Sequence, residues 1–194
     1  MAGVAVVAAA VKKRRTDDRA ARLRLRRVED RHDAVLEQYG EFTGDILAVL
    51  ERPLLADVAV RETADLVHAL AGAADARSVA GSDGAAAYGR AVTALEIAWQ
   101  VADRHARRVG TAQMPERERA AVAQAQRLLR TVLGDGASDA ERQTAYRRAV
   151  RLLDGIVVVP REATAAIEGR ARHHMLLKSH PKAARTGDTE PVRR

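Results

Sequence analysis

Apolar residues in the middle of the chain recur at alternating steps of four and three positions. Between residues 88 and 109 they are Tyr88, Val92, Leu95, Trp99, Ala102, Ala106 and Val109. This spacing puts them on one side of an α-helix, whereas a strand would scatter them over both of its faces. Gly110 follows where a helix is expected to end. The pattern predicts a helix with one buried face, in which Trp99, Leu95 and Val92 anchor the core.

The N-terminal part of the chain carries a similar seam. Its members are Leu25, Val28, Val35, Tyr39, Phe42, Ile46 and Val49, and His32 occupies the one vacant position of the spacing. We expect one helical rod from about residue 4 to about residue 50, ended by Pro53, with Gly40 and Gly44 as weak points. If the rod outruns the rest of the protein, the exposed part of the seam between Leu25 and Val35 is expected to drive self-association.

Further helices are expected over 61–77, from Pro115 to about residue 133, from Ser138 to about 153, and from Pro160 to about 178. Ser138 and Glu141 form an S-x-x-E capping box, which is typical of a helix start. Aromatic residues make up 3% of the chain, so the core depends on Ala, Leu and Val and favours closely packed helices. The predicted fold class is all-α: a helical bundle of five to six helices with a long N-terminal helix and a disordered basic C-terminal tail.

The formal net charge of +7 is unevenly distributed. Residues 12–27 hold nine basic and two acidic residues, and residues 170–194 hold seven basic and two acidic ones, while residues 28–169 carry a net charge of −5. We therefore divide the chain into an N-terminal arm (residues 1–24), a helical bundle (25–178) and a disordered tail (179–194). Arginine greatly outnumbers lysine, which together with the abundant alanine indicates a GC-rich bacterial genome.

The arm combines apolar and basic residues in the order AGVAVVAAAVKKRR. Ten apolar residues cover about 15 Å of helix against a hydrocarbon core of about 30 Å, so the segment as given is too short to span a bilayer. Its positive charges follow the apolar stretch, whereas those of a signal peptide precede it. Two membrane readings stay open: the chain starts inside a longer span, or the arm dips into one leaflet. The alternative is a soluble reading, in which residues 4–11 cover a groove on the protein or fray.

Basic residues of the arm are the predicted contacts with an anionic membrane surface: Lys12, Lys13, Arg14, Arg15, Arg19 and Arg22. Arg24, Arg26 and Arg27, together with the KKRR run at 12–15, could equally bind nucleic-acid phosphates without sequence preference. Base stacking would need aromatic residues, and residues 1–38 contain none, so nucleic acid is the less favoured partner.

Metal-binding and catalytic patterns are weak in this sequence. Glu29 and His32 form E-x-x-H and Asp65 and His68 a looser D-x-x-H, with Glu96 and Glu168 as further carboxylates, but a second true E-x-x-H is missing. The adjacent His173 and His174 are interpreted as an exposed helix end. There is no cysteine, no nucleophile elbow and no phosphate-binding glycine loop. We expect no metal, no cofactor and no enzymatic activity.

These observations favour a non-catalytic interaction or scaffold protein that the arm holds at the cytoplasmic face of the cell membrane. The expected partners are the anionic membrane surface, an unidentified protein, and a second copy through the Leu25–Val49 seam. The alternative is a soluble cytoplasmic protein that associates with nucleic acid through the basic cluster at residues 12–27.

Overall fold

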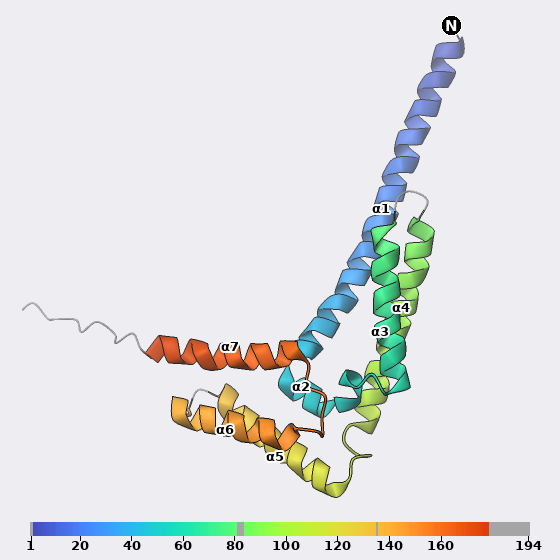
Figure 1. Cartoon of the computed structure of the whole chain (residues 1–194). Helices are drawn as coiled ribbons and strands as arrows, with labels where there is room; N and C mark the ends of the chain where they lie inside the picture. Colours follow the sequence, from blue (N-terminus) through green and yellow to red (C-terminus); the bar gives the residue numbers. More distant parts are fainter. Residues whose placement is uncertain (1, 81–83, 135, 179–194) are drawn as a thin grey trace, which may run out of the picture.

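The protein is built from helices. The computed structural model describes the backbone of residues 2–80, 84–134 and 136–178, and the side chains of residues 12–80, 84–134 and 136–169. These ranges contain no strand, which confirms the all-α prediction. The elements are α1 (Ala2–Gly44), α2 (Ile46–Glu51), the 3-10 helix η1 (Pro53–Ala56), α3 (Arg61–Ser78), α4 (Ala85–Val109), α5 (Glu116–Leu133), α6 (Asp139–Leu153) and α7 (Arg161–Lys178) (Figure 1). The predicted disordered tail, 179–194, lies outside the described residues.

The described chain has seven α-helices, one more than the predicted range, because the expected N-terminal rod is broken at Asp45. The backbone of Asp45 is extended (φ −109°, ψ 105°), and its side chain accepts a hydrogen bond from the backbone N–H of Leu47 at 2.9 Å. This is the geometry of an N-cap, which ends α1 and starts α2 within one residue. The prediction of a single helix to residue 50 is therefore wrong.

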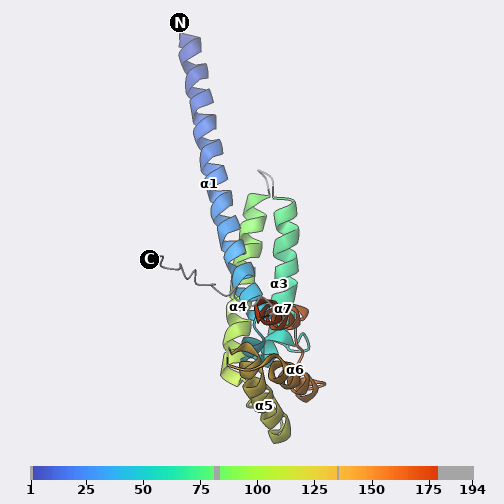
Figure 2. The same cartoon turned by 90° about the vertical axis from the view of Figure 1, so that its left-hand side faces the viewer.

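α1, α3 and α4 pack side by side and form the first of two core clusters (Figures 1 and 2). The predicted anchors Val92 and Leu95 are fully buried, and Trp99 is 8% exposed. The indole N–H of Trp99 donates to the side-chain oxygen of Gln38 at 2.8 Å, which satisfies its one polar group. The ring of Tyr39 meets Trp99 edge to face at 6.2 Å between centroids. These contacts fix the lower part of α1 against α4.

The second cluster lies where α5, α6 and α7 meet α2. Its buried members are Ile46, Leu50, Val122, Ala125, Leu129, Ala149, Leu153, Ala163 and Ile167. The predicted capping box is present, since the Ser138 hydroxyl accepts from the backbone N–H of Glu141 and the Glu141 carboxylate accepts from the backbone N–H of Ser138. Val157, in the connection from α6 to α7, packs against both clusters. It therefore helps α2 to join the two halves of the bundle.

Candidate functional site

The N-terminal arm continues α1 beyond the bundle. Both views show the start of α1 projecting past the ends of α3 and α4 (Figures 1 and 2). Side chains from Lys12 to Arg19 are all exposed. Ala20 is half-buried, and the next half-buried residues are Leu25 and Val28, which lie next to the bundle. A Cβ on Gly89 of α4 would lie 3.7 Å from a methyl group of Val28, an ordinary van der Waals distance, so α1 and α4 are in close contact here. The part of the arm whose side chains the structure describes, residues 12–24, is thus exposed apart from Ala20 and covers about 20 Å of helix.

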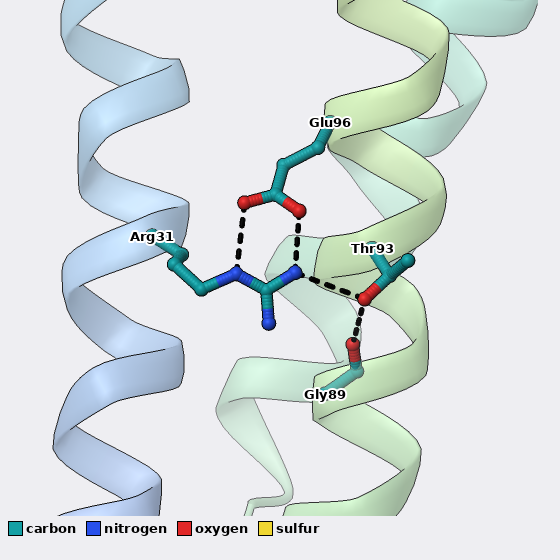
Figure 3. Close-up of polar contacts among 4 residues, drawn as sticks. All are labelled: Arg31, Gly89, Thr93 and Glu96. Atoms are coloured by element: carbon teal, nitrogen blue, oxygen red, sulfur yellow. Dashed lines mark hydrogen bonds and ion pairs between the residues drawn. The ribbon is translucent and has the colours of Figure 1, made fainter.

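Ion pairs hold α1 to α4 and to α3 next to the arm, and Figure 3 shows the contacts with α4. The Arg31 guanidinium is bidentate to the Glu96 carboxylate of α4, with Nε 2.8 Å from Oε1, and it also donates to the Thr93 hydroxyl at 3.0 Å. Arg77 of α3 donates to Asp33 at 2.5 Å. Hydrogen bonds from Arg31 lower the pKa of Glu96, and those from Arg77 lower the pKa of Asp33. The point at which the arm leaves the bundle is therefore fixed from two sides.

Between these ion pairs lies a buried polar contact. Nδ1 of His32, a residue only 2% exposed, is 2.9 Å from the hydroxyl of Tyr88, which is fully buried. Burial lowers the pKa of His32, the positive charge of Arg77 lowers it further, and Asp33 offsets part of the effect. His32 is thus a core residue that joins α1 to α4, and its surroundings favour the neutral form of its imidazole.

The residues considered as metal ligands are dispersed. His32 is buried against Tyr88, His68 is exposed on α3, and Glu96 is engaged by Arg31. His173 and His174 lie outside the residues whose side chains are described. No group of three or more potential ligands occurs among the described side chains.

The predicted self-association seam is largely occupied by the protein's own bundle. Val35, Phe42 and Val49 belong to the first core cluster, and Leu25 and Val28 are half-buried. Little apolar surface of this seam is left for a second copy to cover.

All six predicted membrane contacts are exposed, but they do not share one face of α1. Four of them recur at steps of three or four residues, and Arg26 continues the series, so that five cations lie along one side of the helix. We call this set the basic stripe: Lys12, Arg15, Arg19, Arg22 and Arg26. Lys13 and Arg14 point to other sides. Arg26 is absent from the predicted set of membrane contacts. The alternating steps of three and four residues that lead to Arg19 and Arg22 reach Arg26 next, so its place on this side could have been predicted from the sequence.

The basic stripe is free of partners within the described part of the chain. None of its side chains takes part in a hydrogen bond or ion pair there, and it runs on the side of α1 away from the buried seam residues Val35 and Phe42. Five guanidinium and ammonium groups are therefore available to an external anionic surface over about 20 Å of helix.

A partly open apolar cavity of about 250 Å³ lies between α5, α6 and α7. Ile46, Leu129 and Ile167 are among its lining residues. Two polar side chains of the lining are engaged in local contacts: Tyr146 donates to Glu168 at 3.2 Å and Thr164 to the carbonyl of Pro160 at 3.3 Å. Asp154 also lines the cavity, whose surface is otherwise mainly apolar.

Comparison with protein-family models, with curated proteins and with solved structures gives no match. The function therefore has to be argued from this chain's own residues. None of the helices in the described ranges combines the length and the apolar character that crossing a bilayer requires.

Proposed function

We propose that the protein is a non-catalytic interaction protein whose N-terminal arm binds the anionic cytoplasmic face of the cell membrane. One observation supports the proposal above all others: four of the five cations of the basic stripe lie on the arm beyond the bundle, and none of the five has a partner among the described residues. The bundle then remains free to present its surface to another protein.

Electrostatic attraction to the lipid headgroups supplies the binding energy. A lysine or arginine beside an anionic membrane surface contributes about 1 kcal/mol, and the arm offers several on one side. The sequence of residues 2–11 is apolar and precedes the stripe on the same helix. Apolar contact with the acyl boundary would therefore add to the electrostatic term, as it does for other amphipathic interfacial helices.

Vesicle flotation of the full chain tests the proposal. The variant R15Q/R19Q/R22Q removes three cations of the basic stripe and keeps residues of good helix propensity. The control R130Q/R147Q/R151Q removes three exposed cations from α5 and α6, so that the net charge changes equally. At about 1 kcal/mol for each cation, the stripe variant should bind anionic vesicles roughly 100-fold more weakly than the wild type.

The control variant should bind as the wild type does, and vesicles of neutral lipid should bind neither. Equal losses in the two variants, or equal binding to neutral and anionic vesicles, would refute a role for the stripe. A mobility shift with random duplex DNA is measured in parallel. Binding to duplex without binding to vesicles would replace the membrane proposal by the nucleic-acid alternative.

A further inference from the structure

The face of α1 that carries the basic stripe changes sign below the arm. Continuing at steps of three or four residues, the next positions are acidic, and we call them the acidic stripe: Asp30, Asp33, Glu37 and Glu41. All nine residues of the two stripes are exposed. A single helix face is thus positive over residues 12–26 and negative over residues 30–41.

This segregation of charge does not stabilise α1 as an isolated helix. Arg15 and Arg19 repel each other at a spacing of four residues, as do Glu37 and Glu41, whereas alternating signs at that spacing would stabilise the helix. Glu41 also lies in the last turn of α1, where the helix dipole disfavours an acidic side chain. The pattern therefore needs an explanation outside the chain itself.

Two antiparallel copies of the face are complementary. When residue 28 of one helix lies level with residue 28 of the other, the numbers of any two facing residues add up to about 56. Arg26 then faces the partner's Asp30, Arg19 the partner's Glu37 and Arg15 the partner's Glu41. Arg22 lies opposite the partner's Asp33 with an offset of one residue. Because the arrangement is two-fold symmetric, every contact occurs twice.

We propose that α1 pairs in an antiparallel manner with α1 of a second copy of this chain through the two stripes. A parallel pairing in register would bring like charges together and is disfavoured. Leu23, which is 52% exposed, lies beside the basic stripe and would face the partner's Ala34, adding a small apolar contact.

Although α7 also contacts α1, the nine residues of this face are exposed. Of its nine residues only Asp33 is engaged by the bundle, through Arg77, and its side chain is still 56% exposed. The paired segments, residues 15–41, extend over about 40 Å of helix. This surface is distinct from the Leu25–Val49 seam, which the bundle fills.

The inference does not depend on the membrane proposal, although both use the basic stripe. Reversing two charges of the acidic stripe separates them, because E37R/E41R should weaken the pairing while the arm keeps all its cations and still binds anionic vesicles.

Sedimentation of the full chain at varied salt tests the pairing. The wild type should form a dimer at low ionic strength, about 0.01–0.02 M, and dissociate as salt is raised. R15E/R19E and E37R/E41R should each weaken the dimer roughly 50-fold, because every substituted contact becomes repulsive. The control K13E/R14E makes the same charge change as R15E/R19E on other sides of α1 and should leave the dimer intact.

Mixing the two reversed variants gives the decisive measurement. A heterodimer of R15E/R19E with E37R/E41R has complementary charges at every contact, so it should form where neither variant dimerises alone. A wild type that is monomeric at low salt, a control that loses the dimer equally, or a mixture that stays monomeric would overturn the proposal. Circular dichroism of each variant shows whether its helices are retained.

Discussion

The buried pair of His32 and Tyr88 should make the stability of the protein depend on pH. Burial keeps the pKa of His32 below its ordinary value of 6.5, whereas in the unfolded chain the imidazole titrates near that value. The unfolded state therefore binds more protons in acid. The contribution of neutral His32 to stability is complete above pH 6.5 and is lost as the pH falls below it.

The size of this effect follows from linkage. Linkage limits the loss in the free energy of unfolding between pH 7.5 and pH 5.5 to about 1.4 kcal/mol for this one group, the value for an imidazole that stays neutral throughout in the folded protein. H32L removes the titrating group, so its stability should lack that part of the pH dependence. H32L also leaves the buried Tyr88 hydroxyl without its partner, which costs about 1–3 kcal/mol at neutral pH.

A double variant separates the two effects. In H32L/Y88F both polar groups are replaced by apolar ones, so we expect most of the stability lost in H32L to be regained. Urea unfolding followed by Trp99 fluorescence measures all three proteins, since Trp99 is the one tryptophan of the chain and lies in the same α1–α4 contact. If the wild type and H32L lose equal stability between pH 7.5 and pH 5.5, the reasoning is refuted.

Urea unfolding of three further variants tests a buried hydrogen-bonded arginine, a helix cap and a glycine within α1. R142A should cost about 2 kcal/mol, because the buried guanidinium donates to the carbonyl of Val132 in the last turn of α5 and to that of Ala137 just before α6; an R142K variant as stable as wild type would contradict this. S138A should cost about 1 kcal/mol by removing the N-cap of α6, and an unchanged midpoint would contradict the role of the cap. G40A should stabilise by about 0.5–1 kcal/mol, since nothing lies within 4 Å of the added methyl group, and a loss of stability would show an unseen constraint in α1.

Local signals in the sequence account for most of the fold. The steps from Val92 to Leu95 and Trp99 predict the buried face of α4 because helix periodicity is a property of the segment alone. The capping box at Ser138 is equally local. The start of α6 can therefore be found without any knowledge of the fold.

The break at Asp45 was missed because the apolar spacing continues across it. Phe42, Ile46 and Val49 keep steps of four and three, since the N-cap interrupts the helix at a single residue and leaves the seam in register. The signal was nevertheless present, because an aspartate directly before an apolar run is a typical N-cap.

The candidate site was predictable in part. Clusters of charge are visible in the sequence, but their division into stripes depends on α1 being continuous past Leu25. The contacts that fix the arm could not be predicted, because Arg31 meets Glu96 across 65 residues and His32 meets Tyr88 across 56. Nothing in either local segment specifies such a distant partner.

The separation of α1 from α4 along the chain also affects the order of events during synthesis. Gln38 of α1 meets Trp99 of α4 across 61 residues, which a ribosome adds in about 3–12 s. During that interval Val35 and Phe42 have no α4 to cover them, while the helical pair α3 and α4 is still being completed. Val35 and Phe42 are thus synthesised before α3 and α4 but can be buried only after α4 has been added.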